Sequence, residues 1–348
     1  MEKHNYTPQQ TIMKNITTII LASVLCLQSC AQNDKEMNAK TTQILGSLYK
    51  EVQHYDKRIN YHATILIGGC NYELLINDFP VDRYFGSENG SGSGSVPINR
   101  AILKPGVQSW KIRIYPIHDQ KEIDDKIQMT PRPEIEDGAR IELHIEGIRF
   151  KKNGDIEKRL GKIVEFKTPV IEDKETRTNK LADAGKSYIE YSGTFQADVP
   201  YHLNGWENSD DLTKDNKENL EQALLREYEK YRSWIQNREL DKIAESNLKS
   251  EQEEAQALFY DSKTNNTIIE ENYINGWGQK GLKAYPLENY IIKYYGNGKL
   301  VTLQRKDYVG DPALAGEFEN EKTKTKQMKT FCLFFHRPKG KTALEVIR

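Results

Sequence analysis

The stretch that divides this chain is DNKENLEQALLREYEKYRSWI, residues 215–235. Its apolar side chains recur every three or four residues, which is the spacing of one face of an α-helix. The stripe consists of Leu220, Leu224, Tyr228, Tyr231 and Ile235. Asp215, followed three residues later by Glu218, has the pattern of an N-cap and its reciprocal partner. We therefore expect a long helix to begin at residue 215.

The chain before this helix has the period of β-strands. Trp110, Ile112 and Ile114 alternate with polar residues, as does the apolar set of residues 141–145. The runs 61–67 and 70–76 flank Gly68-Gly69, which predicts a hairpin. Further strands are expected at residues 162–166 and 188–199. Together these strands predict an antiparallel β-sandwich over residues 59–200.

Two segments of this half contain little to bury. GSENGSGSGS, residues 86–95, predicts a surface loop, and it lacks the Lys-Ser or Lys-Thr that a phosphate-binding loop needs after its last glycine. The Pro-rich, charged residues 119–137 are also expected to form a loop. Both segments are compatible with the border of a ligand site and with tolerated insertions, and the second interpretation is favoured.

After residue 235 the pattern predicts more helices and then strands. A break at Asn237 precedes a short helical stretch around residues 240–244, and Ser250 with Glu253 predicts the start of a third helix that ends near Phe259. The period then changes to two. Residues 290–295 and 299–305 flank Gly296-Asn297-Gly298, a strong hairpin signal. Further strands are expected at residues 313–318, 328–336 and 342–347.

The order of these elements carries a resemblance for the second half. Helices followed by an antiparallel sheet are found in the NTF2-like superfamily, and residues 215–348 resemble it in this order alone. The resemblance implies an α+β cone with a pocket between sheet and helices, and it assigns no catalytic residue. The expected fold is thus an all-β sandwich-like domain, a linker over residues 201–214, and an α+β domain over residues 215–348.

The N-terminus has the composition of an export signal. Residues 16–27 form an apolar run that is too short to span a bilayer as a helix but has the length of a signal-peptide core. Lys14 follows Met13 directly, whereas residues 1–12 are polar and include Glu2. We interpret Met13 as the true start and residues 1–29 as a signal peptide.

The apolar run ends in Leu27-Gln28-Ser29-Cys30, which resembles the lipobox of bacterial lipoproteins. Gln28 departs from the small residue that is usual at its position. The resemblance implies that Cys30 receives a diacylglyceryl group, becomes the first residue after cleavage and is acylated on its amine. Several acyl chains anchor a protein stably. We expect a cell-envelope protein on the outer membrane, with residues 30–58 as a lipidated tether that is polar and flexible over residues 31–40.

Charge and cysteine content limit the partners. The formal net charge of −1 offers no electrostatic footprint for nucleic acid, so no nucleic-acid partner is expected. With Cys26 inside the signal peptide and Cys30 lipidated, Cys70 and Cys332 remain. Each lies in an apolar, strand-like run of a different domain, which predicts two buried free thiols.

Three side chains are candidates for ligand binding. Trp206 and Trp277 each end an Asn-Gly-Trp tripeptide, where an exposed indole would stack on a sugar or a partner protein. Packing at the domain interface is the favoured alternative. His336, at the end of an apolar run, has the chemistry of a general base, but a histidine satisfied at the rim of the fold is favoured.

Motifs for cofactors and metals are missing from the sequence. Residues 276–281 match G-x-G-x-x-G without the strand before and the helix after that a dinucleotide site requires. The acidic residues 207–215 lack the ligand order of a calcium loop. No cofactor, metal or catalytic residue is therefore assigned. Two function classes stay open: a non-catalytic binding or accessory lipoprotein for a protein or glycan, which is favoured, and a hydrolase with its site in the C-terminal cone.

Overall fold

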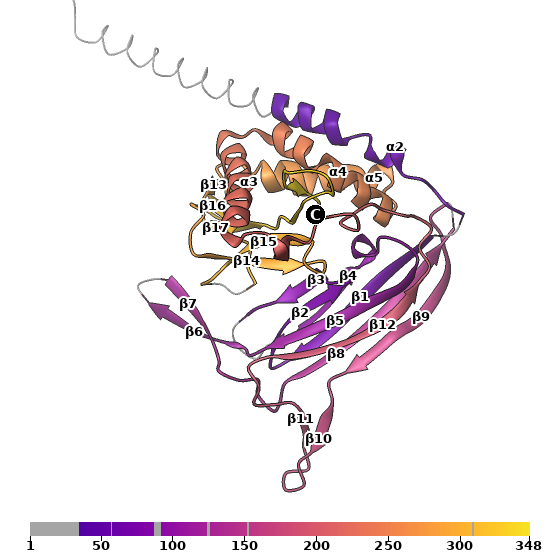
Figure 1. Cartoon of the computed structure of the whole chain (residues 1–348), viewed down its shortest axis with the longest axis vertical. Coiled ribbons are helices and arrows are strands. Elements are labelled where there is room, and N and C mark those ends of the chain that lie inside the picture. Colours follow the sequence, from indigo (N-terminus) through magenta and orange to yellow (C-terminus); the bar gives the residue numbers. More distant parts are fainter. Residues whose placement is uncertain (1–34, 57, 87–91, 124–125, 152, 308–309) are drawn as a thin grey trace, which may run out of the picture.

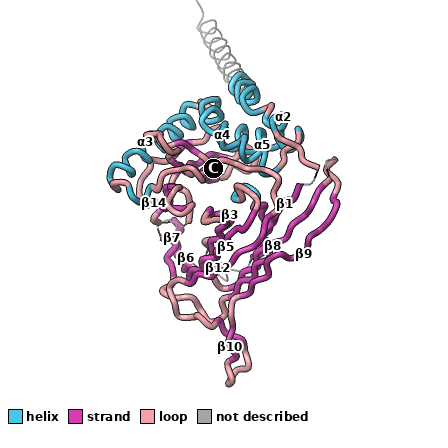
Figure 2. The backbone as a smooth tube through the Cα atoms, turned by 45° about the vertical axis from the view of Figure 1, so that its right-hand side comes forward, coloured by secondary structure: helices cyan, strands magenta, loops and turns pink. Residues whose placement is uncertain are grey.

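The computed structural model describes residues 35–56, 58–86, 92–123, 126–151, 153–307 and 310–348. A β-rich half is followed by a half in which helices combine with smaller sheets, as the sequence predicts (Figure 1). Figure 2 shows the helices at one end of the molecule and the long strands at the other. The signal peptide and Cys30 lie outside the described residues, so both stay predictions.

One layer of the sandwich is an antiparallel sheet in the order β4-β1-β8-β9. Its strands are β4 (Gly92–Pro97), β1 (Arg58–Gly68), β8 (Arg140–Phe150) and β9 (Ile156–Lys167). Ile141, Leu143 and Ile145 on β8 are buried, which confirms the alternation expected there. Their side chains form one face of the sandwich core.

The second layer has the order β12-β5-β2-β3. Its strands are β12 (Ile189–Ala197), β5 (Gly106–Tyr115), β2 (Asn71–Ile76) and β3 (Phe79–Tyr84). Trp110, Ile112 and Ile114 are buried as predicted. Trp110 meets Phe166 of the first layer with ring centroids 5.2 Å apart, so the two sheets pack face to face.

The hairpin expected across Gly68-Gly69 is wrong, because β1 and β2 belong to different sheets. β1 pairs with β4 and β8, whereas β2 pairs with β3 and β5. All six residues of β2 are buried. Because β2 is covered on both faces, neither face is exposed to solvent. The second half of the chain covers the face that carries Glu73. Gly69, with φ 68°, supplies the turn between the layers.

Both expected loops contain strands. Gly92 to Ser95 lie on β4, the edge strand, in register with β1 through Ile65↔Gly94. Residues 119–137 include the hairpin of β6 (His118–Ile123) and β7 (Lys126–Pro131). Edge strands and projecting hairpins are held mainly by main-chain hydrogen bonds. Their side chains therefore need not alternate between apolar and polar, and the sequence pattern did not reveal these strands. A second hairpin, β10 (Val170–Glu172) and β11 (Asn179–Leu181), projects at the far end of the sandwich (Figure 1).

The long helix is present as α3 (Lys217–Asn237), and its predicted apolar stripe is buried throughout. Its N-cap is Asn216, whose side chain accepts the amide of Asn219 at 3.0 Å. The prediction of Asp215 as N-cap was wrong by one residue. The Asp215 carboxylate accepts a hydrogen bond from Arg337 at 3.1 Å and is thereby drawn away from the helix end.

The helices after α3 differ from expectation. A single helix, α4 (Leu240–Leu258), replaces the two that were predicted, and Ser250 is buried inside it rather than capping a new one. Two further elements, α5 (Ser262–Ile268) and the π-helix η3 (Ile269–Trp277), lie before the first strand expected at residues 290–295, in a stretch for which the sequence predicted neither a helix nor a named strand. A π-helix has a wider turn than an α-helix, so its apolar side chains do not follow the 3.6-residue period.

Two small sheets complete the second half. One has the order β13-β16-β17 and the other β14-β15-β18-β19. Their strands are β13 (Lys283–Ala284), β16 (Leu314–Glu319), β17 (Lys326–Phe331), β14 (Tyr290–Tyr295), β15 (Leu300–Arg305), β18 (Phe335–His336) and β19 (Glu345–Val346). The hairpin at Gly296-Asn297-Gly298 is confirmed by the pairing of β14 with β15.

The segment expected to be a flexible tether is helical in the part that the structure describes. Residues 35–45 are helical, and α2 (Leu48–Glu51) follows. Leu45, Leu48 and Val52 are buried in the core of the second half, which explains why this polar-looking segment is ordered. The N-terminal helices therefore lie against the helical end of the molecule (Figure 1).

The junction between the halves is apolar and continuous. Phe79 of β3 lies 5.2 Å from Trp206 and 4.9 Å from Phe334, centroid to centroid. Beside them, Glu73 accepts hydrogen bonds from Tyr295 and from Arg113, the latter at 3.0 Å. Residues 201–214, expected to be a linker, thus pack between two cores rather than in solvent.

Candidate functional site

Two recesses flank the π-helix η3 and share one residue, Lys329. The acidic recess is a cavity of about 380 Å³ bounded by α4, η3 and the strand residues 329–333. The basic recess is larger, about 890 Å³, and lies between η3, the loop after β16 and the N-terminal helix. The two recesses together form the candidate functional site.

The local sequence explains why a π-helix stands here. Asp261 caps α5 by accepting a hydrogen bond from the amide of Thr264 at 2.7 Å. From Ile269 the helix continues with the wider π-turn, in which Ile269 and Tyr273 are both buried. The amide of Gly278 closes the last turn on the carbonyl of Tyr273 at 2.7 Å. A Cβ on Gly278 would lie 3.0 Å from a backbone oxygen and from Leu240, so glycine fits this closure best. π-Turns occur frequently at functional sites.

A chain of buried polar groups runs from α3 to the wall of the acidic recess. The Tyr231 hydroxyl donates to Asn247 Oδ1 at 2.6 Å, and Asn247 Nδ2 donates to the Tyr273 hydroxyl at 3.2 Å. Tyr273 in turn donates to Glu251 Oε1 at 2.7 Å. Because each member is satisfied by the next, the network holds Glu251 in one position at the recess.

The carboxyl of Glu251 is electrostatically unusual. Burial disfavours its charged form, and the nearby charge of Glu254 acts in the same direction, so the pKa of Glu251 rises to about 7. Both residues line the acidic recess, as does Glu271 of η3. Opposite them, desolvation lowers the pKa of Lys329. The acidic recess therefore combines a carboxyl that is half protonated near neutral pH with two further carboxylates.

Trp277, one of the predicted site residues, does line the acidic recess. Its ring stacks on Phe331 at 4.2 Å with an interplanar angle of 20° and lies 5.6 Å from Tyr231. The indole is half-buried, in the π-helix rather than in a turn. Part of the indole lines the recess, but the ring is not the exposed stacking surface for a sugar or a partner protein that the sequence suggested.

Trp206 lies elsewhere, at the junction of the two halves. It is 4% exposed, stacks on Phe79 and carries the Arg348 guanidinium 5.6 Å above its ring. Part of the indole borders a separate cavity of about 290 Å³. The structure thus does not bring Trp206 and Trp277 together, and the packing that the sequence favoured for Trp206 is present.

His336 lies outside both recesses. It is 1% exposed, and its Nδ1 lies 2.7 Å from the Ser209 hydroxyl. Its Nε2 has no hydrogen-bond partner within the described part of the chain. Burial lowers the pKa of His336 to about 4, so the ring is neutral at pH 7. Two carboxylates of neighbouring strands and turns that could serve a general base are paired with other residues: Glu317 accepts from Tyr285 and Asp307 from Arg305.

The two remaining cysteines are free. Cys70 is buried as predicted, and burial raises its pKa to about 12. Cys332 is exposed, and the prediction of a second buried thiol was wrong. It follows the end of β17, where the strand pairing stops, and it lines the acidic recess.

Sequence reasoning missed the acidic recess. Asn247, Glu251 and Glu254 are spaced by four and three residues, which places them on one face of a continuous helix. That signal was hidden because the helix was expected to restart at Ser250. Glu271 and Asn272 had no signal, since the π-helix was not foreseen.

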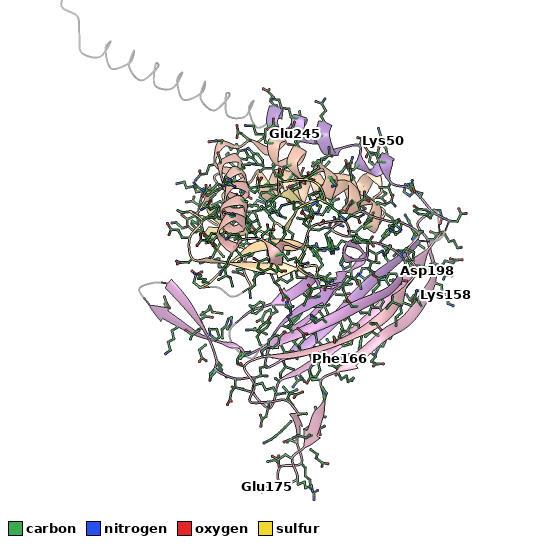
Figure 3. All side chains as sticks on the ribbon, in the orientation of Figure 1. Lys50, Lys158, Phe166, Glu175, Asp198 and Glu245 are labelled. Carbon is green, nitrogen blue, oxygen red and sulfur yellow. The ribbon has the colours of Figure 1, made fainter. Side chains whose placement is uncertain are left out.

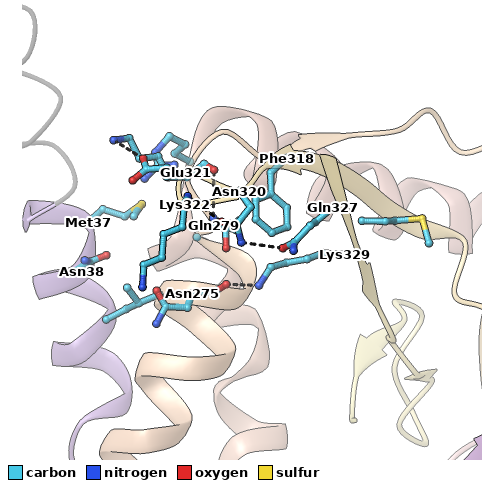
Figure 4. A pocket seen from close by; sticks show the side chains of 15 residues that line it. Met37, Asn38, Asn275, Gln279, Phe318, Asn320, Glu321, Lys322, Gln327 and Lys329 are labelled. Atoms are coloured by element: carbon cyan, nitrogen blue, oxygen red, sulfur yellow. Dashed lines mark hydrogen bonds and ion pairs between the residues drawn. The ribbon is translucent and has the colours of Figure 1, made fainter. Parts of the chain in front are cut away.

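The basic recess gathers cationic side chains (Figure 4). Arg238, Lys280, Lys322 and Lys329 line it together with one carboxylate, Glu321. Met37 and Asn38 of the N-terminal helix form the opposite wall, and Figure 4 shows Lys322 extending toward Asn275.

Comparisons with known proteins give no match: none among protein-family models, none among curated proteins and none among solved structures. Within the described ranges, no three His, Cys, Asp or Glu side chains are grouped so that they could hold a metal ion. No helix in the same ranges has both the length and the apolar character needed to cross a membrane.

Proposed function

We propose that this protein is a lipid-anchored binding protein of the cell envelope, facing away from the cytoplasm. Acyl groups on Cys30 hold it to the outer membrane, and the acidic recess binds an amine or guanidinium group of a protein or glycan partner. The role is non-catalytic. Residues 215–348 adopt the NTF2-like arrangement in this proposal, with the acidic recess at the mouth between helices and sheet.

The convergence of Glu251, Glu254 and Glu271 on one small recess carries the proposal. Within the described chain, neither Glu254 nor Glu271 forms a salt bridge. Lys329 and Arg348 line the same recess, but neither forms a salt bridge with Glu254 or Glu271 in the described chain, so these two carboxylates are available to a cationic ligand. Asn272 and Trp277, which also line the recess, add a polar and an aromatic side chain, a combination suited to an amino sugar or a lysine side chain.

Packing supports binding over catalysis. The space between the helices and sheets of the second half is filled by Tyr228, Tyr231, Tyr273 and Phe335, each below 2% exposure. A deep open cone is therefore not available in this part of the molecule. The acidic recess, at about 380 Å³, is small enough to suit contact with part of a larger ligand.

Binding of small amines tests the proposal. Calorimetry would compare glucosamine with N-acetylglucosamine, and a Gly-Lys-Gly peptide with its lysine-acetylated form, because acetylation converts the charged amine into a neutral amide. We expect the charged member of a pair to bind and the double variant Glu254→Gln, Glu271→Gln to lose at least tenfold in affinity. Glu245→Gln, an exposed position on the same helix, is the matched control. Equal binding of charged and acetylated probes would contradict the proposal.

One observation favours a second candidate, a hydrolase. A carboxyl whose pKa lies near 7 is suited to donate a proton at neutral pH, and Glu251 has this property. Nitrophenyl glycosides and esters would reveal such an activity. Glu251→Gln would then abolish turnover while the affinity for the amine probes stays within about threefold. Turnover that survives Glu251→Gln would exclude this role.

A further inference from the structure

The basic recess has an excess of positive charge. Lys280, Lys322 and Lys329 line it, and Glu321 is the one carboxylate among its lining residues. Arg238 also lines it but has an interaction partner of its own, so the excess is counted on the three lysines. Glu321 pairs with Lys280 at 3.1 Å, with both side chains more than two-thirds exposed. Lys322 has no salt bridge within the described chain. This arrangement leaves positive charge to meet an anion.

Lys329 gives a second, independent indication of an anionic ligand. Its ammonium group donates to the carbonyl of Asn275, a neutral acceptor, and desolvation lowers its pKa (Figure 4). Lys329 also borders the acidic recess, but it forms no salt bridge with the carboxylates there within the described chain. A cation that is partly withdrawn from water without a paired carboxylate is destabilised. An anionic group in the recess would supply a countercharge.

The walls of the basic recess are not uniformly charged. Met37, Ile274 and Phe318 offer apolar surface beside the cations. Across the recess, Asn38 Oδ1 is buried without a hydrogen-bond partner in the described chain, so it is available to accept from a hydroxyl. Phosphate, hydroxyl and hydrocarbon groups together match a glycerophospholipid headgroup with the start of its acyl chains.

Covalent geometry brings this recess close to the proposed anchor. Residue 35 begins the described helix, so Cys30 lies at most about 18 Å away along five extended residues. Met37 and Asn38 follow two and three residues later in the helix, which rises about 1.5 Å per residue, so they lie within about 5 Å of residue 35 along its axis. The opposite end, marked by Glu175 in Figure 3, is far from Lys50 and Glu245 beside this helix.

We propose that the basic recess binds the headgroup of an anionic glycerophospholipid in the membrane that carries the anchor. This inference rests on the proposed lipidation of Cys30, which sets the distance to the membrane. The bound headgroup orients the molecule so that the helical end faces the membrane and the sandwich, with its β10–β11 hairpin, points outward.

Native mass spectrometry of the acylated full chain in detergent tests the inference, with phosphatidylglycerol or phosphatidylcholine added. We expect one phosphatidylglycerol to be retained per chain and phosphatidylcholine to be lost. Lys280→Glu with Lys322→Glu should weaken retention at least tenfold, since both side chains are exposed and their replacement leaves the core intact. Lys158→Glu with Arg159→Glu, exposed on β9, is the charge-matched control and should retain the lipid.

Two results would overturn the inference: equal retention of both lipids, or retention unchanged by the lysine variant. Retention of glycerol 3-phosphate without phosphatidylglycerol would assign the recess to a soluble phosphate ester instead. The covalent acyl groups on Cys30 are weighed in the same spectrum, so a missing anchor is recognised separately. Neither substituted lysine lines the acidic recess, which keeps this test distinct from the amine-binding test.

Discussion

The carboxylate of Glu253 on α4 receives the guanidinium of Arg348 at 3.1 Å and the amide of Gly205 at 3.0 and 3.1 Å. Its side chain is 11% exposed and that of Arg348 is 2% exposed. Three segments that are distant in sequence thus meet at one carboxylate. They are the helix α4, the stretch between the halves at Gly205, and Arg348, which follows β19.

Glu253→Gln should be strongly destabilising. The substitution leaves the buried Arg348 guanidinium without its salt-bridge partner, and breaking a buried pair in this way costs about 3–5 kcal/mol. Urea unfolding would measure the loss. Glu227→Gln, which removes the 2.7 Å pair with the half-exposed Lys230, is the control and should cost below about 1 kcal/mol. Similar losses in both variants would argue against a structural role for Glu253.

Glu251 should make the folded protein less stable as pH rises. Its pKa is raised from 4.5 to about 7, so the folded state binds more protons than the unfolded state between these values. Its contribution to the free energy of unfolding is therefore greatest below pH 4.5, falls through pH 7 and is constant above. Glu251→Gln should flatten this part of the stability profile, whereas Glu245→Gln should leave it unchanged. An identical slope in wild type and Glu251→Gln would contradict the assignment.

His336 should act in the opposite direction. Its pKa falls from 6.5 to about 4, so the unfolded state binds the extra proton between these values. Stability from this residue is fully present above pH 6.5 and decreases toward pH 4, by up to about 3 kcal/mol. His336→Asn keeps a polar partner for Ser209 and should remove this acid-side loss. Thermal unfolding from pH 4 to 7 would show it as a smaller change in Tm.

Limited trypsin digestion should begin in the β10–β11 hairpin. Lys174 and Arg177 are exposed at its projecting end, next to Glu175 in Figure 3. Proteolysis needs a segment that can leave the fold locally. The stretch between the halves, which the sequence predicted to be a linker, is held by buried Trp206 and Leu212. A first cut within residues 204–216, seen by mass spectrometry, would show that the junction opens readily.

Cys30→Ala, expressed with the native leader, should yield a protein that is not acylated and is largely absent from the membrane fraction. Loss of the thiol removes the acceptor of the diacylglyceryl group, and a stable anchor needs several chains. Labelling with radioactive palmitate and fractionation would measure both effects, with Cys70→Ala as the control that keeps the anchor. Continued labelling of Cys30→Ala would end the lipoprotein interpretation.

Some elements were predictable because their signal is local. The α3 stripe from Leu220 to Ile235 and the β5 alternation at Trp110 each follow from one buried face of one element. The β14–β15 hairpin follows from Gly296-Asn297-Gly298, where residues 296, 297 and 298 all have positive φ. In each case a short stretch of sequence contains the whole physical cause.

Other features depend on neighbours that no local pattern identifies. Strand β2 is buried on both faces, so its sequence could not show that it leaves β1 for the other sheet. The N-terminal helix looks like a polar tether until Leu45 and Leu48 are seen to pack on the second half. The acidic recess was missed for the same reason, since its residues come from α4, η3 and β17.

The sequence by itself determined the helical stripe of α3 and the alternation of β5 and β8, and it carries the whole of the case for a lipid on Cys30. Only the tertiary structure decided which strands pair, where Glu251 lies and how its carboxyl titrates. The reason is physical: backbone period and turn chemistry are set by adjacent residues, whereas desolvation and hydrogen bonding depend on what packs around a side chain. Tyr273, 22 positions from Glu251 in the sequence, supplies the contact that positions it.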